Sequence, residues 1–456
     1  MKKALLFIAY LSFAILALQA QSVQELINQT DLARLTTTVR EFSGEDATTV
    51  NGNPVTLLNR VSNSGNDDAA YYIKERMEAL GLTVEEHDYS AGGKNIIATQ
   101  VGNTNPNDIY LISAHYDSVA NYCADDNASG VAAIMELARI LSPHCTENTV
   151  VYALWDEEET GLHGSRVYAQ RAANDGDNIL GAFNIDMMGY DGDDDSRFDI
   201  DVRPFTNSLA MKDDIIAVNT TYGLNLIPVV VNPGTTASDH SSFWGQGYSA
   251  VLFGESWENN DITPGYHSSS DRINLFNMPY YHEMSKLVVG YMATKANTID
   301  DTTINNATFL TSNEVSTSAT YQWVDCDNAN SPISNEINKN FTPAVTGNYA
   351  VQVTVSGCTL MSDCVAFNVL GVNDYQLENL RMFPNPTTDV IKLSGFSSDV
   401  TQVNTKLISI TGKEIFNKKL NVNKSEINTV DLPSGVYFLE VGVSSNTKKT
   451  FKVVKQ

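Results

Sequence analysis

The chain has 456 residues and a formal net charge of −25 at pH 7. A chain of this length is too long for one hydrophobic core and predicts about two to four domains. Its apolar fraction of 42% is typical of a globular protein, and its acidity argues against nucleic acid as a partner.

The N-terminus has the order of residues that is typical of a secretory signal peptide. Lys2 and Lys3 precede the apolar run Leu5–Leu18, and small and polar residues follow it. We therefore predict a signal peptide over residues 1–20, cleaved after Ala20. The alternative is a membrane anchor, but the run is too short to span a bilayer comfortably. No later stretch approaches that length, so we expect a soluble mature protein with no membrane partner.

Residues 68–300 alternate between strand and helix patterns. The apolar run Thr149–Trp155 is typical of a strand that is buried on both faces of a sheet. The order of elements predicts an α/β fold, with a mixed, mostly parallel central sheet and helices on both faces. Strands are predicted at 95–101, 108–114, 149–155, 179–185 and 249–253, and helices at 69–80, 129–141, 164–172, 207–222 and 279–296.

The last third of the chain predicts two small β-sandwich domains. Residues 301–372 are rich in Thr, Ser, Asn and Val, with an alternating strand at Tyr349–Val355. Their Tyr321-Gln322-Trp323 segment resembles the core of a small immunoglobulin-like or PKD-like sandwich. Residues 373–456 form a third, β-rich unit with a basic end, from Lys448 to Lys455.

All seven histidines precede residue 300, so chemistry is expected in the first part only. Open α/β sheets bind ligands beyond the carboxyl ends of their strands. Four groups of candidate residues follow predicted strands there: His115, then Glu158 with Glu159, then Asp186, then His267.

Each of these motifs also has an ordinary structural explanation. Asp125, in Ala124-Asp125-Asp126-Asn127, precedes a predicted helix and suits a helix cap. The acidic run Glu157–Glu159 could be a solvated loop, but it follows an apolar strand and leads into glycines and a helix. In His115-Tyr116-Asp117, the histidine alone could be an ordinary surface residue, but the aspartate can also orient the imidazole of a metal-bound histidine.

Together the side chains fit two zinc ions and a general base. Zinc takes imidazole and carboxylate ligands, and a catalytic site keeps one position open for water. Two metals about 3.5–4 Å apart can act on both the attacking and the leaving atoms of a hydrolysis. A tyrosine beside the last histidine, Tyr266, can donate a hydrogen bond to a developing oxyanion.

These motifs resemble the two-zinc aminopeptidases of peptidase family M28, over about residues 65–297. That family includes bacterial leucyl aminopeptidase, aminopeptidase Y and, more distantly, glutamate carboxypeptidase II. The resemblance implies a secreted aminopeptidase, formed by residues 21–300, that acts on peptides with a free N-terminus and holds two Zn²⁺ ions.

The resemblance also implies a role for each residue. Asp125 would bridge the two zinc ions and be followed by a cis peptide bond, Asp125–Asp126, although Cys123-Ala124-Asp125 lacks the glycine common before the bridging aspartate. The remaining roles are His115 and Asp186 as ligands of one zinc, Glu159 and His267 as ligands of the other, Glu158 as the general base, Asp117 as the partner of His115, and Tyr266 as the residue that steadies the tetrahedral intermediate.

Two other functions remain open. One is another exopeptidase on the same scaffold, such as a carboxypeptidase, or a glutaminyl cyclase, although a cyclase tends to work with one zinc. The other is a non-catalytic binding protein, which the loss of any ligand would have favoured.

Residues 375–456 resemble the C-terminal sorting domain of the type IX secretion system, on the segments Phe383–Thr387 and Leu432–Tyr437. This resemblance implies export through the periplasm to the cell surface or the medium, with the type IX machinery as a partner and removal of the tail. The alternative is an ordinary adhesive β-domain.

Two further patterns are less specific. Five cysteines in an exported chain predict disulfides, with Cys123–Cys145 as one plausible pair. Asp191, Asp193 and Asp195 alternate as in a calcium loop but lack the glycine and distal glutamate of an EF-hand, so a solvated loop is expected.

Overall fold

The structure is a computed structural model that describes residues 23–61, 63–259, 261–369, 377–398, 400–443 and 448–456. The predicted signal peptide lies outside these residues. The chain divides into two compact units, one of residues 1–342 with 347–366, and one of residues 343–346 with 367–456. Within the described ranges, no helix is long and apolar enough to cross a membrane. The predicted domain boundaries near 300 and 372 remain predictions.

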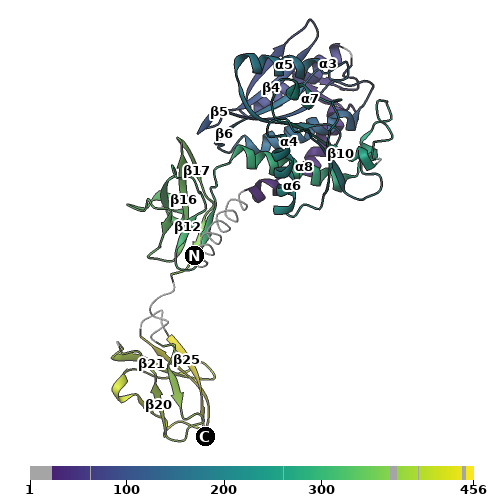
Figure 1. Cartoon of the computed structure of the whole chain (residues 1–456). Coiled ribbons are helices and arrows are strands. Elements are labelled where there is room, and N and C mark those ends of the chain that lie inside the picture. Colours follow the sequence, from purple (N-terminus) through teal and green to yellow (C-terminus); the bar gives the residue numbers. More distant parts are fainter. Residues whose placement is uncertain (1–22, 62, 260, 370–376, 399, 444–447) are drawn as a thin grey trace. The chain divides into compact units, whose positions relative to one another are not determined.

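An eight-stranded mixed sheet forms the centre of the first unit (Figure 1). Strands β6, β5, β7 and β10 are its parallel core, and antiparallel pairing adds β4 at one side and β8 at the other. The order across the sheet is β3 (Thr83–Asp88), β4 (Lys94–Gln100), β6 (Asn148–Trp155), β5 (Asn105–His115), β7 (Asn178–Ile185), β10 (Ala250–Glu255), β8 (Arg197–Asp201) and β9 (Ile227–Val231).

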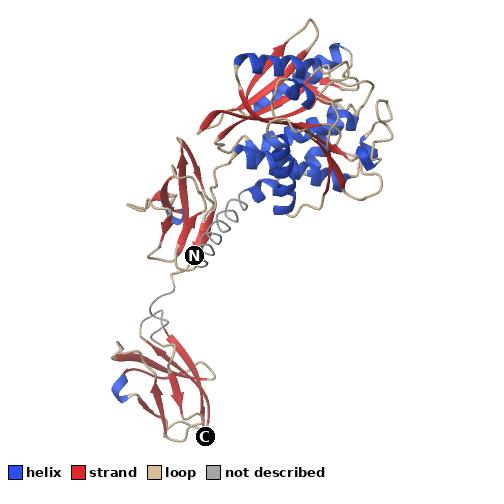
Figure 2. Cartoon of the chain, viewed as in Figure 1, coloured by secondary structure: helices blue, strands red, loops and turns tan. Residues whose placement is uncertain are grey.

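Helices cover both faces of this sheet, as the sequence predicted (Figure 2). Successive side chains of a strand point to opposite faces, so Tyr152 and Leu154 of β6 enter one hydrophobic core while Ala153 and Trp155 enter the other. The first core holds residues of α2 (Leu32–Phe42), α3 (Asn63–Ala79), α4 (Gly130–Leu141), α6 (Ser208–Thr221) and α8 (Met278–Ala296), and the second holds residues of α5 (His163–Asp175) and α7 (His240–Gly245).

The predicted strands and helices of this unit are confirmed within a few residues, but three strands were missed. These are β3, β8 and β9. The first two carry several acidic residues, and Asp and Glu are depleted in strands. In β8 the acids alternate with the buried Phe198 and Ile200, so the apolar half of the strand supplies its packing.

A β-rich segment follows α8 within the same unit. It contains a three-stranded sheet and a second, five-stranded sheet. Trp323 of the second sheet is buried against Phe341 of the first. The strands are β11 (Thr303–Asn305), β12 (Leu310–Ser312) and β15 (Asn340–Phe341) in the first, and β13 (Thr320–Asp325), β14 (Ser331–Pro332), β16 (Gly347–Val355), β17 (Cys358–Met361) and β18 (Val365–Phe367) in the second. A separate small hairpin near the N-terminus pairs β1 (Thr48–Val50) with β2 (Asn53–Val55).

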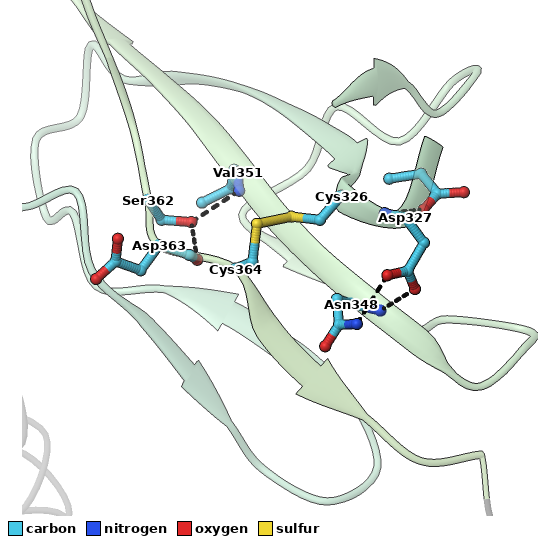
Figure 3. The surroundings of a disulfide bond; sticks show 8 residues. Cys326, Asp327, Asn348, Val351, Ser362, Asp363 and Cys364 are labelled. Atoms are coloured by element: carbon cyan, nitrogen blue, oxygen red, sulfur yellow. Dashed lines mark hydrogen bonds between the residues drawn. A yellow bond between two sulfur atoms is a disulfide. The ribbon is translucent and has the colours of Figure 1, made fainter. Parts of the chain in front are cut away.

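The suggested disulfide Cys123–Cys145 is wrong. Cys145 is bonded to Cys358, and Cys326 is bonded to Cys364 beside β16 (Figure 3). Cys123 is buried with a free thiol, whose sulfur donates to the carbonyl oxygen of Ala120 at 3.6 Å. The first disulfide therefore joins the peptidase-like sheet region to the β-rich segment.

The second unit is all β. Its two sheets have the orders β19-β20-β23 and β22-β21-β24-β25, and they enclose a core that includes Leu393, Leu407 and Leu439. The strands are β19 (Arg381–Phe383), β20 (Val390–Ser394), β21 (Gln402–Ser409), β22 (Glu414–Asn421), β23 (Glu426–Asn428), β24 (Gly435–Gly442) and β25 (Lys448–Lys455).

Candidate active site

The carboxyl ends of the parallel strands place the predicted residues in one cluster. His115 is the last residue of β5, Glu158 and Glu159 follow β6, and Asp186 follows β7. His267 lies in the long loop after β10. Because these strands run in the same direction, their ends meet at one edge of the sheet.

The residue between the two histidines is Asp126 and not Asp125. Its Oδ1 lies 3.1 Å from Nε2 of His115, and its Oδ2 lies 3.3 Å from Nε2 of His267. The cis peptide bond predicted at Asp125–Asp126 is found at Asp126–Asn127. The prediction therefore placed both features one residue too early in the helical turn η1 (Ala124–Ser129).

Asp125 points to a different set of partners. Its Oδ1 accepts hydrogen bonds from the backbone amides of Met188 (3.1 Å) and Gly189 (2.8 Å), just beyond β7. Burial and the charge of Asp271 raise the pKa of Asp125 to about 7. This carboxyl group therefore holds the chain after Asp186 in place and does not face the histidines.

Two carboxylates complete the cluster, one beside each histidine. Oδ1 of Asp186 lies 3.4 Å from Nε2 of His115, and Oε2 of Glu159 lies 3.2 Å from Nε2 of His267. Ser238 donates a 2.7 Å hydrogen bond to the other oxygen of Asp186. This hydrogen bond fixes the orientation of the carboxylate, whereas the sequence pattern suggested only a helix start at Ser238.

Asp117 connects the first histidine to the glutamate loop. Its Oδ1 lies 3.2 Å from Nδ1 of His115, and its two oxygens accept the backbone amides of Glu158 and Glu159 at 3.2 Å each. One buried carboxylate thus orients an imidazole ring and the backbone that carries two further carboxylates.

Tyr266 stacks on His267 with the ring centroids 3.8 Å apart. Its side chain, like that of Glu158, lines a cavity of about 510 Å³ that also includes His115, Asp126 and Asp186. Tyr266 is 38% exposed, so its side chain is open to solvent at this cavity.

Two buried residues outside the cluster, Arg60 and Asp271, hold its loops in place, and no sequence pattern indicated either of them. The guanidinium group of Arg60 donates to the backbone oxygens of Phe42, Tyr116, Tyr122 and Cys123 at 2.9–3.0 Å. It therefore fixes the segment that leads from His115 toward Asp126.

Asp271 supports the next part of the same segment. Its carboxylate accepts the backbone amides of Asp125 at 2.9 Å and 3.1 Å and that of Asp126 at 2.9 Å. These bonds orient η1, and so they decide which of the two adjacent aspartates faces the histidines.

The electrostatics of the cluster fit divalent cations. Burial first, and then the neighbouring carboxylates, raise the pKa values of Glu158 and Glu159. The pKa of Asp126 is lowered overall. Burial alone would raise it, but the hydrogen bonds with His115 and His267 have the larger combined effect. Oε1 of Glu159 is buried without a hydrogen-bond partner. A cation placed among these atoms would satisfy the free oxygen and relieve the repulsion between the carboxylates.

The donor set indicates zinc. His115, Asp126 and Glu159 each offer one ligand atom, and these atoms lie within 4.8 Å of one another. Imidazole nitrogens together with carboxylate oxygens are common zinc ligands.

Comparison with known proteins identifies two domains. Residues 95–292 match the model of peptidase family M28, and residues 381–456 match that of the secretion system C-terminal sorting domain. The first domain contains every residue of the cluster described above. The second indicates that the chain is secreted or exported to the cell surface.

Curated relatives are similar over part of their length. A probable zinc metalloprotease of Pyrenophora teres f. teres (strain 0-1) is 29% identical over 204 residues, which are 36% of this chain and 42% of the relative. A probable leucine aminopeptidase of Trichophyton verrucosum (strain HKI 0517) is 27% identical over 240 residues, 47% of this chain and 60% of the relative. The chain thus spans about half the length of these curated relatives.

Solved structures share the fold of the first unit. The LapA aminopeptidase of Legionella pneumophila superposes with a TM-score of 0.53 at 19% identity, covering 60% of this chain and 75% of that one. The aminopeptidase of Aneurinibacillus sp. strain AM-1 gives a TM-score of 0.50 at 18% identity, covering 60% and 96%. The predicted α/β fold is confirmed.

Proposed function

Because the chain carries a peptidase family M28 domain and a C-terminal sorting domain, we propose that it is an exported zinc aminopeptidase. The enzyme would use a pair of bound zinc ions to remove N-terminal residues from peptides. The named relatives, a zinc metalloprotease and a leucine aminopeptidase, support this class of reaction.

One observation carries the proposal. The two oxygens of Asp126 face different histidines, and each histidine has a second carboxylate beside it. The six contacting atoms of these five side chains thus divide into two sets, each with one imidazole nitrogen and two carboxylate oxygens, and Asp126 belongs to both. Three protein ligands with one open position are typical of catalytic zinc. We assign His115, Asp126 and Asp186 to one ion, and His267, Asp126 and Glu159 to the other.

Zinc ions held there would supply Lewis-acid activation of the scissile carbonyl group and of a water molecule. Glu158 lines the same cavity but is not paired with either histidine in these two sets. We assign it as the general base that takes a proton from the attacking water and returns it to the leaving amine.

The remaining residues orient the reacting groups. Asp117 holds His115 and the backbone amides of Glu158 and Glu159 in one network, which keeps the base at a fixed position relative to the ligands. The Tyr266 hydroxyl group donates a hydrogen bond to the oxyanion that develops on the carbonyl oxygen.

The charge of the cavity favours a substrate with a free amino terminus. Among the described residues that line it there are eight acids and no lysine or arginine. The acids, which include the proposed bridge and the proposed base, are Asp126, Glu158, Glu159, Asp186, Asp199, Asp201, Glu255 and Glu258. A C-terminal carboxylate would find no lysine or arginine partner there, whereas an ammonium group would find several carboxylates that are not assigned to zinc. This favours an aminopeptidase over a carboxypeptidase.

A substrate panel tests the proposed function. The zinc-loaded protein is expected to release the first residue from free aminoacyl substrates and to leave the N-acetylated forms intact. A chelator is expected to abolish turnover, and added zinc to restore it. Cyclisation of N-terminal glutaminyl peptides without hydrolysis of the panel would replace the proposal with a glutaminyl cyclase. Export of the chain by the type IX machinery is part of the same proposal and rests on the sorting domain.

A further inference from the structure

The cavity beside the proposed metal ligands has a second acidic region, formed by Asp199, Asp201 and Glu258. None of the three contacts the histidines. Asp199 and Asp201 are alternate residues of β8, so their side chains lie on the same face of the strand. The residues between them and before them, Ile200 and Phe198, are packed in the hydrophobic core on the other face.

The two strand aspartates are buried and have neutral partners. Asp199 is 4% exposed and Asp201 is 7% exposed. Asp199 accepts the hydroxyl group of Ser256 at 2.8 Å and the amide of Glu258 at 3.1 Å, and Asp201 accepts the amide of Thr235 at 2.7 Å. These donors orient the carboxylates without neutralising their charge.

No cation of the chain lines this region of the described cavity. Arg203 is the nearby cation, but its Nε donates to the carbonyl oxygen of Gly234 and its guanidinium group lies over the ring of Trp244. Burial is the main cause that raises the pKa of Asp201 to about 6, and the charges of Asp199 and Glu258 raise it further. The hydrogen bond from Thr235 and the charge of Arg203 offset only part of this rise. The region therefore carries buried negative charge that a bound cation would stabilise.

Aromatic side chains stand at the exposed side of the same cavity. Trp257 and Tyr266 both line it and pack edge to face with their centroids 5.1 Å apart. Both are partly exposed, at 39% and 38%. Aromatic faces attract ammonium and guanidinium groups and also pack against the methylene chain behind them.

We propose that this region binds the side chain of the substrate's first residue, and that the enzyme prefers peptides beginning with lysine or arginine. The inference rests on the proposed aminopeptidase function and names its substrate class. A long side chain ending in a cation matches buried carboxylates on β8 behind an aromatic rim. A leucine side chain would leave those carboxylates without a counter-charge.

The test compares kcat/KM for lysyl, arginyl and leucyl p-nitroanilides on the zinc-loaded full chain. The unmodified protein is expected to favour the two basic substrates by at least about tenfold. Asp201→Asn and Glu258→Gln remove charge while keeping shape, and each is expected to lower the lysyl-to-leucyl ratio by about tenfold or more. The matched control is Asp213→Asn on α6, an exposed acid that is not among the lining residues; its ratio is expected to stay unchanged.

The outcomes distinguish failure of the proposed preference for lysine and arginine from failure of the proposed aminopeptidase function. Turnover of the leucyl substrate equal to or above that of the basic ones would overturn the proposed preference but leave the aminopeptidase intact. Equal losses for all substrates in Asp201→Asn and Glu258→Gln would assign these acids a structural role and overturn it as well. No turnover of any free aminoacyl substrate would overturn the proposed function itself, and this inference with it.

A different observation concerns the loop between β7 and β8. The sequence predicts a solvated loop at Asp191, Asp193 and Asp195, but Asp191 is only 6% exposed. One carboxylate oxygen each of Asp191, Asp193, Asp195 and Asp261 lie within 4.8 Å of one another. Asp261 comes from a distant part of the chain and is 3% exposed. Oδ1 of Asp261 accepts the amide of Gly192 at 3.1 Å, whereas its Oδ2 is buried without a hydrogen-bond partner.

We infer that these four carboxylates bind a calcium ion. The donors are all oxygen atoms, which suit a hard cation, and Asp193 is exposed and leaves room for water in the 6–8 positions that calcium takes at about 2.3–2.6 Å. Arg197 pairs with Asp195 alone, so most of the negative charge is uncompensated. The unpartnered oxygen of Asp261 gains a ligand bond in this arrangement.

Calorimetric titration of the zinc-loaded full chain with calcium chloride tests this site. We expect one calcium ion per chain and a rise in Tm with excess calcium. Asp261→Asn and Asp193→Asn are each expected to weaken binding by tenfold or more, while Asp213→Asn binds as the unmodified chain does. Because Asp193 is exposed, its variant stays informative if Asp261→Asn fails to fold. Absence of binding at millimolar calcium, or unchanged binding in both variants, would overturn the inference.

Discussion

At the scale of single residues, the proposed site depends on which of two adjacent aspartates faces the histidines. Asp126→Ala removes the carboxylate shared by both ligand sets, so we expect loss of bound zinc and a fall in activity of more than about 100-fold. Asp125→Ala is the matched control. It removes the acceptor for the amides of Met188 and Gly189, so we expect lower Tm with zinc still bound. Metal analysis and calorimetry on both variants measure the zinc content and the Tm. If Asp125→Ala lost its zinc while Asp126→Ala kept it, the assignment of Asp126 would be wrong.

Glu158 provides a second test at this scale. Glu158→Gln keeps the size of the side chain but cannot accept a proton, so kcat is expected to fall by about 10²–10⁴-fold. Zinc content is expected to stay at the value of the unmodified protein, because Glu158 is outside both ligand sets. Activity within threefold of the unmodified protein, with zinc unchanged, would remove Glu158 from the role of base.

The sequence placed most of the cluster but could not choose between Asp125 and Asp126. His115, Asp186 and His267 each stand alone among acids and histidines at a strand end or in a loop, so their position along the chain is enough to propose them as ligands. Two consecutive acids in a turn point in different directions, and either fits the motif. The choice is made by the bonds from Asp271 to both backbone amides, which connect residues about 145 positions apart in the chain.

At the scale of elements, Arg60 holds the loop after β5. Arg60→Met leaves four carbonyl oxygens without their donor, and a buried acceptor without a partner costs about 1–3 kcal/mol. We expect the free energy of unfolding to fall by about 3 kcal/mol or more, together with weaker zinc binding. The control is Arg166→Met, an exposed arginine whose Nη2 donates to the carbonyl oxygen of Gly161, for which a change below about 1 kcal/mol is expected. Urea unfolding of both variants measures the difference.

The start of α7 carries a buried neutral histidine that makes stability depend on pH. Burial lowers the pKa of His240 to about 3, from an ordinary value of 6.5. The unfolded chain therefore binds a proton that the folded chain does not, so this contribution is complete above pH 6.5 and is lost as the pH falls toward 3. Between these values we expect unfolding free energy to drop by about 1.4 kcal/mol per pH unit on account of His240.

His240→Gln keeps an amide donor for the Thr235 oxygen that His240 contacts at 3.0 Å, but it does not titrate. Its unfolding free energy is therefore expected to depend less steeply on pH, by about one proton. Urea unfolding of both metal-free proteins at pH 4, 5 and 6 separates this effect from loss of zinc. Parallel pH profiles for the two proteins would show that His240 does not cause the dependence.

The same elements show what sequence patterns can and cannot predict about the fold. A strand buried on both faces, such as β6, is apolar throughout and is predicted directly. β8 is only half apolar, because its other face turns Asp199 and Asp201 toward a cavity. The acids weaken the strand pattern of β8, and the same acids line the cavity. One of the three missed strands is therefore a strand that forms part of the cavity wall.

At the scale of the whole molecule, cysteine pairing connects parts that are far apart in the sequence. Five cysteines allow many pairings, and a sequence alone does not distinguish them. Cys145 follows α4 in the peptidase-like part and bonds Cys358 of β17, 213 residues later. A hydrogen bond between the hydroxyl groups of Thr104 and Ser356 lies between the same two regions. The β-rich segment is therefore bound covalently to the region that carries the site.

Replacing this disulfide tests whether the β-rich segment stabilises the peptidase domain. A crosslink that closes a long loop restricts the unfolded chain, and typical stabilisation is about 2–4 kcal/mol. In the double variant Cys145→Ser, Cys358→Ser we expect a lower Tm and faster thermal loss of activity. We expect kcat at 25 °C to be unchanged, because neither cysteine is among the residues that line the cavity. The matched control, Cys326→Ser with Cys364→Ser, removes a crosslink of only 38 residues within the β-rich segment. It is expected to lower the stability of that segment while activity survives heating as in the unmodified chain. Equal thermal inactivation of the two double variants would show that the crosslink between the two regions adds nothing to the stability of the site.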